Sequence, residues 1–204
     1  MQHGHALSGA AAGRRLSIDQ QMSDQALVAL ITRRDKHAMQ VLFARYSVRM
    51  FRFLLRFVDS ESLAEDLVSE TFIEVWRHAG QYEARSLVST WLLAIARHKA
   101  LSALRQRSTD ELDDDAIDSI EDPGENPEIA MQKTERSAIL LNCLEQLSPA
   151  HREIIDLVYY HERTIGDVAK IIGVPQNTVK TRMFYARRGI AKLMAAQGVE
   201  RAWL

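Results

Sequence analysis

The sequence predicts an all-α protein of two small helical domains joined by a flexible acidic linker, and three observations support this. Only nine Gly and four Pro occur in 204 residues, and three of the prolines fall between positions 123 and 149. Elsewhere, apolar residues recur three or four positions apart, as in amphipathic helices, and no segment alternates with the period of a strand. The acidic side chains concentrate between 108 and 135, where 11 of them against one lysine give a net charge of −10.

The distribution of charge also shows two basic blocks, which the net charge of the whole chain hides. The chain has 26 Lys and Arg against 27 Asp and Glu, a formal net charge of −1 that by itself argues against a nucleic-acid partner. Residues 1–107, however, have a net charge of +5, and residues 136–204 have a net charge of +4. This distribution favours nucleic-acid binding by the two flanking blocks.

In the N-terminal domain, expected over 23–107, two helices come first. Ser23 is placed to cap a helix through residues 26–31, and apolar positions spaced for a second helix run from Val41 to Phe57. Residues 1–22 precede them as a disordered leader without the contiguous apolar stretch of a secretory signal.

Two further helices complete this domain. Ser62 and Glu65 have the spacing of a capping box that opens the third helix, and Gly80 closes it. Residues 81–89 are expected to form a loop, and a fourth helix is expected from about Thr90 to Arg107.

The predicted linker covers residues 108–128. It has few large apolar side chains and therefore cannot bury enough surface to offset its ordering entropy. Two interpretations remain open from composition: a solvated tether, or a strap that occupies a basic channel in a partner or mimics nucleic acid.

The C-terminal domain, expected over 129–196 with a tail at 197–204, begins with a helix over 129–146. Cys143 lies in this helix, and a buried, inert thiol is favoured over a redox sensor. Being the only cysteine, it excludes a disulfide framework within the chain. Ser148 before Pro149 marks the start of the next helix, through Val158.

Residues 164–193 have the pattern of a helix-turn-helix motif. Thr164 and Asp167 form a capping-box pattern, Gly173 stands where a helix end favours positive φ, and Pro175 makes the turn into a helix from Gln176 or Asn177. The second helix of such a motif enters the DNA major groove.

The two faces of this second helix differ in chemistry. At ~100° per residue, one side of this helix contains the apolar residues expected to face the core: Val179, Met183, Ala186, Ile190 and Leu193. The opposite side collects Asn177, Lys180, Thr181, Phe184, Tyr185, Arg188 and Lys192. Six basic and no acidic residues occur between Val168 and Val199, so DNA binding is favoured over an ordinary surface helix.

The helices of the N-terminal domain indicate two different kinds of partner. Between Ala84 and Thr109 there are five basic residues and no carboxylate, and Trp91 begins the helix, an arrangement that suits single-stranded nucleic acid. Trp91 is equally compatible with a core position. The helix over 62–78 interleaves acidic and apolar residues, which fits protein docking, although an ordinary amphipathic helix has the same pattern.

Together these segments resemble a bacterial RNA polymerase sigma factor of the extracytoplasmic-function (ECF) class. The similarity is carried by the stretches 63–82, 89–107 and 147–193, and it extends over roughly 23–196. It implies a region 2-like helical bundle and a region 4-like helix-turn-helix domain. It further implies that the protein binds core RNA polymerase, through the β′ coiled coil and the β subunit, and directs recognition and melting of promoter DNA.

The resemblance assigns roles to named residues. The docking segment would contact the β′ coiled coil through Asp66, Leu67, Glu70, Thr71 and Phe72. The melted −10 strand would be captured by Arg85, Ser86, Trp91, Arg97, His98, Lys99 and Arg105. The −35 duplex would be recognised by Asn177, Lys180, Thr181, Phe184, Tyr185 and Arg188. The linker would thread through the polymerase cleft, and an anti-sigma factor is an expected partner.

Three residues depart from the family pattern. Ser69 replaces a usual Gln in the docking segment, which docking should tolerate. His98 replaces a usual Asn and Ser102 a usual Asp, both beside the −10 pocket, so the base preference there is not transferred from relatives.

Enzymatic function is not expected. His161-Glu162 lacks the second histidine of a zinc-protease motif, and no phosphate-binding glycine loop or Cys/His ligand cluster is present, so no metal or cofactor is predicted. No apolar run approaches the ~20 residues of a membrane span, and a cytoplasmic protein is expected. The alternatives are a stand-alone helix-turn-helix regulator with an N-terminal sensor or dimerisation domain, and a protein-interaction adaptor.

Overall fold

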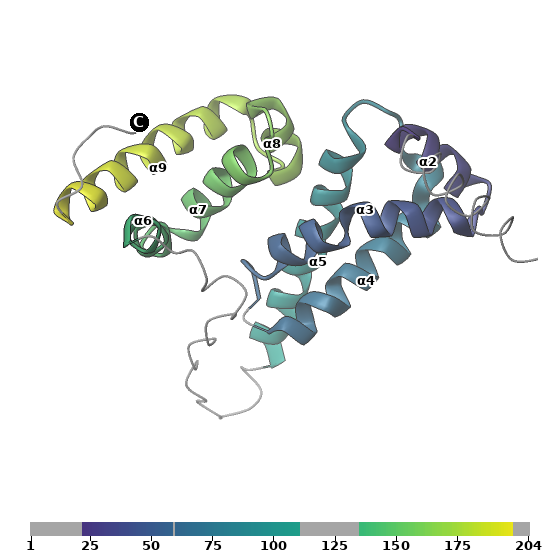
Figure 1. Cartoon of the computed structure of the whole chain (residues 1–204), viewed down its shortest axis with the longest axis horizontal. Coiled ribbons are helices and arrows are strands. Elements are labelled where there is room, and N and C mark those ends of the chain that lie inside the picture. Colours follow the sequence, from purple (N-terminus) through teal and green to yellow (C-terminus); the bar gives the residue numbers. More distant parts are fainter. Residues whose placement is uncertain (1–21, 59, 111–134, 198–204) are drawn as a thin grey trace, which may run out of the picture. The chain divides into compact units, whose positions relative to one another are not determined.

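The computed structural model describes residues 22–58, 60–110 and 135–197, and every regular element among them is a helix (Figure 1). The chain divides into two compact units, Met1–Ala116 and Ile117–Leu204. The all-α class predicted from the sequence is therefore confirmed. The leader before residue 22, most of the predicted linker and the tail after Gln197 lie outside the described residues.

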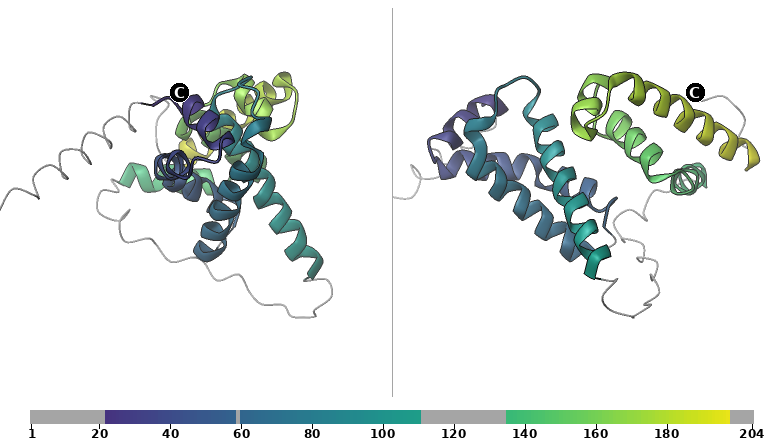
Figure 2. Two further views of the ribbon diagram at one scale, coloured as in Figure 1. Left: turned by 90° about the vertical axis from the view of Figure 1, so that its right-hand side faces the viewer. Right: turned by 180° about the vertical axis from the view of Figure 1, so that it is seen from behind.

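In unit 1, the described residues form a bundle of four helices. They are α2 (Asp24–Thr32), α3 (Lys36–Leu54), α4 (Glu61–His78) and α5 (Val88–Asp110), with a short 3₁₀ turn, η1 (Ala79–Gln81), after α4. The helices α3, α4 and α5 pack against one another, and α2 packs mainly against α3 (Figures 1 and 2). Their inward side chains form the core: Leu27, Ile31, Leu42, Met50, Phe53, Leu54, Leu67, Phe72, Val75, Leu92 and Leu93.

The helix starts follow the capping chemistry, with one correction. Ser23 caps α2 as predicted, since its hydroxyl accepts a hydrogen bond from the Ala26 amide at 3.2 Å. The predicted capping box at Ser62 is wrong, because α4 already begins at Glu61. Ser60 has extended backbone angles and its hydroxyl accepts from the Leu63 amide at 3.3 Å, so it is the capping residue.

The boundaries around α5 also differ from the prediction. The helix begins at Val88 rather than Thr90, and it continues to Asp110 rather than ending at Arg107. Residues 108–110 were assigned to the linker from their composition alone. Ser, Thr and Asp are weak but tolerated helix formers, so a helix that is already nucleated can extend through them.

Among the described residues, unit 2 has its longest helix last, and its other α-helices pack against that one. Its elements are α6 (Glu135–Glu145), α7 (Pro149–Ile155), the π-helical turn η3 (Asp156–Tyr160), α8 (Ile165–Ile172) and α9 (Gln176–Ala196). Figure 1 shows α9 running beside α7, and α6 and α8 also pack against it. Gly189 permits this packing, because a Cβ there would lie 3.0 Å from Leu147 Cδ2.

Hydrogen bonds from a side chain of α7 connect this helix to the end of α6. Pro149 occupies the first turn as predicted, with Ser148 before it, although the Ser148 hydroxyl makes no capping hydrogen bond. Arg152, one turn further, donates hydrogen bonds to the carbonyls of Leu144, Glu145 and Leu147. The Leu144 carbonyl also accepts from the Leu147 amide at 3.2 Å, so the Arg152 side chain adds to the backbone hydrogen bonds that end α6.

Two buried features of unit 2 bear on earlier predictions. Cys143 is completely buried and desolvation raises its pKa, which confirms the buried position and disfavours the reactive thiolate. The helix predicted through Val158 continues as the wider π-helical turn η3. The buried Asp156 carboxylate in this turn lies 3.4 Å from Nε2 of buried His161, which follows the turn. Within the described residues, no helix is both long and apolar enough to cross a membrane.

Candidate nucleic-acid and partner interfaces

The loop between η1 and α5 is held in shape by Tyr82. Its hydroxyl donates a hydrogen bond to the Ser86 carbonyl at 2.6 Å, and its ring centre lies 5.1 Å from that of Trp91. Desolvation raises the Tyr82 pKa above its ordinary value. Between these contacts Ala84 has a positive φ of 54°, and Arg85 is exposed and pairs with Glu83 at 2.7 Å. The loop therefore presents a constrained backbone with a basic side chain outside.

The solvent face of α5 contains three of the predicted strand-binding residues. Trp91, His98 and Arg105 are spaced by seven residues, so they lie along one side of the helix. His98 and Arg105 are exposed, while Trp91 is half-buried against Tyr82 and still reaches the surface. Both interpretations of Trp91 are thus partly satisfied, since it packs on the loop and presents an edge.

The other predicted strand-binding residues on α5 lie at the two borders of its buried stripe. Arg97 is on one border and Lys99 on the other, and both are half-buried. The Lys99 ammonium lies 3.7 Å from the Glu70 carboxylate and 3.6 Å from that of Glu74. In the free protein this charge therefore faces α4, and the predicted contact of Lys99 with DNA stays a prediction.

The docking segment on α4 divides into exposed and buried residues. Asp66 and Glu70 are exposed and remain available to a partner. Leu67, Thr71 and Phe72 are buried in the core of unit 1, and the Thr71 hydroxyl donates to the Leu67 carbonyl at 2.7 Å. In the free protein the surfaces of these three contact other helices, and their predicted docking contacts stay a prediction.

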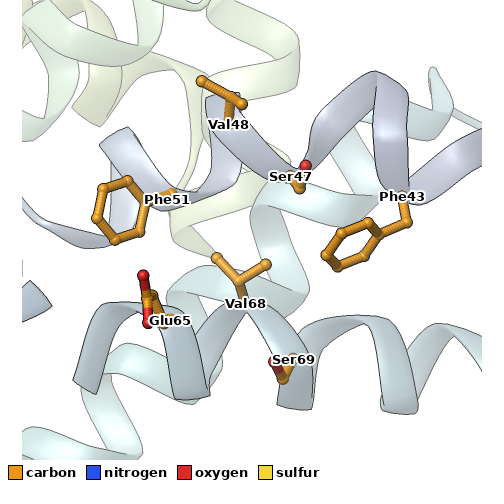
Figure 3. Close-up of a pocket in the computed structure, with 7 residues that line it drawn as sticks. All are labelled: Phe43, Ser47, Val48, Phe51, Glu65, Val68 and Ser69. Carbon is orange, nitrogen blue, oxygen red and sulfur yellow. The ribbon is translucent and has the colours of Figure 1, made fainter. Parts of the chain in front are cut away.

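A groove between α3 and α4 adds residues that the sequence interpretation missed. It has a volume of about 410 Å³, and Phe43, Phe51 and Val68 point into it (Figure 3). Phe43 is 43% exposed and packs on buried Phe72, with ring centres 4.9 Å apart. Val48, 60% exposed, lines the same groove. A sequence signal existed for Val48 alone, which lies away from the core stripe of α3 at the helical period, whereas Phe43 falls within the stripe, between Met50 and Leu54.

The helix-turn-helix geometry matches its sequence pattern closely. The Thr164 hydroxyl accepts from the Asp167 amide at 3.1 Å and donates to the Asp167 carboxylate at 2.6 Å, which opens α8. Gly173 ends that helix in the left-handed conformation, with φ 71°. Pro175 precedes α9, which begins at Gln176. The predicted motif is therefore present, with its second helix in the predicted place.

The two predicted faces of α9 are confirmed by burial. Val179, Met183, Ala186 and Ile190 are buried, and Leu193 near the end is half-buried. All the residues assigned to the opposite face are exposed: Asn177, Lys180, Thr181, Phe184, Tyr185, Arg188 and Lys192.

Two adjacent aromatic side chains stand out on the α9 face. Phe184 is 60% and Tyr185 53% exposed, and their rings touch edge to face with centres 5.4 Å apart. Beside them, the Arg187 guanidinium lies over the exposed ring of Tyr159 at 5.7 Å, an aromatic–cation contact absent from the sequence prediction. An acid-free helix face with exposed aromatics can contact both phosphates and base edges.

Comparison with known families and relatives agrees with this geometry. Residues 42–109 match the family model Sigma-70 region 2, and residues 143–192 match Sigma-70, region 4. The RNA polymerase sigma-H factor of Pseudomonas aeruginosa is 31% identical over 183 residues, covering 85% of this chain and 95% of that protein. The ECF RNA polymerase sigma-E factor of Haemophilus influenzae is 30% identical over 182 residues, covering 84% and 95%.

The chain belongs to the ECF class of RNA polymerase sigma factors. As an alternative sigma factor, it acts in transcription initiation, and the interpretation as a stand-alone regulator is not favoured. Members of this family are initiation factors rather than catalysts. The resemblance seen in the sequence is thus confirmed at the level of family, fold and general function.

Solved structures place the fold in the same group. The sigma factor RpoE from Bartonella quintana, solved with the anti-sigma factor NepR, is 26% identical, with a TM-score of 0.65 over 76% of this chain and 96% of that one. CnrH, solved with the cytosolic domain of CnrY, has the same fold at 21% identity, with a TM-score of 0.61 over 85% and 97%.

Proposed function

We propose that this ECF sigma factor divides promoter recognition between its two units. Unit 2 binds the −35 duplex through α9, and unit 1 binds core polymerase through α3 and α4 and the melted −10 strand through α5. The observation that supports this most strongly is the exposed, acid-free face of α9, because it lies opposite a buried stripe on the second helix of a helix-turn-helix motif.

On α9 the proposed contacts follow from side-chain chemistry. Lys180 and Arg188 bind backbone phosphates, which supplies affinity without base preference. Asn177 and Thr181 lie in the first turns, where a recognition helix is closest to the base edges. Phe184 and Tyr185 contact apolar base surfaces such as thymine methyl groups.

In unit 1 the strand-binding surface is the loop with Arg85 and Ser86 and the solvent face of α5. Trp91 provides an aromatic edge for a displaced base, and His98 and Arg105 provide polar and basic groups beside it. Capture of unstacked bases offsets the few kcal/mol that each opened step costs, so binding energy drives promoter melting.

The docking surface combines the α3–α4 groove with the acidic residues Asp66 and Glu70. The groove has an apolar floor with Glu65 in its lining, and exposed Asp66 and Glu70 lie on the same helix. This surface fits a partner helix with apolar and basic side chains, the role we assign to the β′ coiled coil. The β subunit is the second proposed polymerase contact.

Two further proposals concern regulation and location. The similar sigma factor RpoE was solved with the anti-sigma factor NepR, which supports an anti-sigma factor as a partner of this protein. Activity with polymerase on chromosomal promoters places the protein in the cytoplasm.

The decisive experiment is in vitro selection of promoters with reconstituted holoenzyme. We expect enrichment of sequences with conserved −35 and −10 blocks and core-dependent transcripts from them. If core enzyme with the protein gives no promoter-specific transcript, while the protein alone binds duplex DNA tightly, the proposed function is wrong.

A further inference from the structure

Lys99 lies at the boundary between the two surfaces proposed for unit 1. It belongs to α5, one residue after exposed His98, yet its ammonium faces α4, whose docking side includes Glu70. Its distances to Glu70 and Glu74, 3.7 and 3.6 Å, are those of ion pairs rather than hydrogen bonds. The side chain is thus held by charge, without a directional bond that fixes its position.

The two carboxylates are not equivalent. The second carboxylate oxygen of Glu74 lies 3.0 Å from Nδ1 of His78. Glu74 therefore has two partners within unit 1, and its side chain is only one-third exposed. Glu70 is 55% exposed and stands among the proposed docking residues. A basic partner surface can therefore compete with Lys99 for Glu70, while Glu74 stays beside it.

This competition has a consequence on α5. Lysine has a long, flexible stem, so its ammonium can move between the α4 carboxylates and the adjoining solvent face with little rearrangement of the backbone. In the free protein, attraction to the two carboxylates holds the Lys99 ammonium away from a nucleic-acid strand on that face. Loss of one carboxylate to a partner weakens this hold.

We propose that Lys99 couples polymerase docking at α4 to strand binding at α5. In the free protein Glu70 and Glu74 hold its charge, and engagement of Glu70 by core polymerase releases it to the phosphates of the captured strand. Lys99 is therefore a positioning residue for docking and a conditional contact for DNA. The coupling rests on the function proposed for these two helices, and it is reciprocal, because each binding event favours the other.

A double-mutant cycle in the full-length protein tests this coupling. The variants are Lys99→Gln, Glu70→Gln with Glu74→Gln, and all three together, each checked for helix content by circular dichroism. The measurement is the Kd for a fluorescein-labelled single-stranded oligonucleotide at low ionic strength, where exposed ion pairs are strongest. Glu61→Gln with Glu145→Gln is the control, since it also removes two negative charges, at exposed positions away from Lys99.

With Lys99 present, removal of both carboxylates should tighten strand binding about two- to fivefold, the range of exposed ion-pair energies. With glutamine at position 99, the same change should tighten binding no more than the general charge effect set by Glu61→Gln with Glu145→Gln. Equal tightening with and without Lys99, or none in either background, overturns the coupling.

Core polymerase provides the second measurement. Lys99→Gln should bind core enzyme about two- to fivefold more tightly, because Glu70 no longer has an internal partner, whereas Lys99→Arg should bind as the wild type does. Unchanged affinity of Lys99→Gln contradicts the competition. If the wild-type holoenzyme is active but the cycle shows no coupling, this inference fails alone; if the wild type does not bind core, the proposed function fails instead.

Discussion

At the scale of single residues, Asp24 joins α2 to α3 in unit 1. Its carboxylate accepts hydrogen bonds from Arg45 and from the hydroxyl of Tyr46, both on α3, while neighbouring Ser23 caps α2. Tyr46 is buried, and burial together with the hydrogen bond and the charge of Asp24 raises its pKa to about 12. The protonated phenol is therefore part of the folded structure.

Tyr46→Phe should lower the free energy of unfolding of unit 1 by about 1–2 kcal/mol near neutral pH, because the Asp24 carboxylate loses a donor. The raised pKa adds a pH dependence. The contribution of the protonated hydroxyl is fully present below pH 10, the ordinary tyrosine pKa, and is lost as pH rises towards 12. Urea unfolding at neutral and alkaline pH measures both effects.

The matched control is Tyr159→Phe, since that side chain is exposed in unit 2. Tyr46→Phe should show a smaller alkaline loss of stability than the wild type, and the control should not. An identical alkaline loss in wild type and Tyr46→Phe would assign the pH dependence to other groups.

At the scale of elements, each functional helix has one face in the core and another face with distinct chemistry. The solvent face of α9 is basic and aromatic, that of α5 is basic with one aromatic edge, and that of α4 is acidic beside an apolar groove. These differences assign partners to helices: nucleic acid for α9 and α5, and a basic, apolar protein surface for α4.

Phe184→Ala with Tyr185→Ala tests the division of labour from the DNA side. Both side chains are exposed, so the variant should fold normally, keep its affinity for core polymerase and lose about tenfold or more in −35-dependent initiation. Transcription from promoters with and without a −35 block measures the effect. Loss of core binding in this variant would contradict the assignment.

Asp66→Lys tests the same division from the polymerase side. Reversal of an exposed charge on the docking rim should weaken core binding about five- to tenfold, most clearly at low salt. The control is Glu145→Lys, which makes the same change in net charge at an exposed position in unit 2. Unchanged core affinity would remove Asp66 from the docking surface.

At the scale of the whole molecule, the net charge of −1 results from cancellation. The segment 108–135 has a net charge of −10 and separates blocks of +5 and +4 that contain the proposed DNA-binding helices. Most of this segment lies outside the described residues, so its role is argued from charge alone. In the absence of polymerase, it is expected to screen the basic faces and weaken DNA binding.

Replacement of Asp113, Asp114 and Asp115 by asparagine should therefore raise the affinity of the free protein for duplex DNA severalfold at low salt, with a smaller gain at high salt. The measurement is a salt titration of binding without core enzyme. If affinity does not change, the role of the acidic segment is confined to the holoenzyme.

The sequence by itself determined the helical class, the helix-turn-helix and the chemistry of its second helix. These features depend on local rules: the helical period separates Val179 and Met183 from Phe184 and Tyr185, Gly173 supplies the left-handed residue, and Thr164 caps α8. Local rules also located α2, α3 and α5 to within a few residues. They placed the start of α4 wrongly, because Ser60 and Ser62 offer nearly the same capping chemistry.

The tertiary structure decided which residues at the edge of a helix's buried face contact a neighbouring helix. Leu67, Thr71 and Phe72 share the docking segment with Asp66, yet packing against other helices buries them. The groove floor at Phe43 exists only where α3 meets α4, and Lys99 pairs with α4 only because that helix lies alongside α5. Helical periodicity indicates how far a residue stands from the core stripe, but the partner of a residue at its edge depends on the position of the adjacent helix.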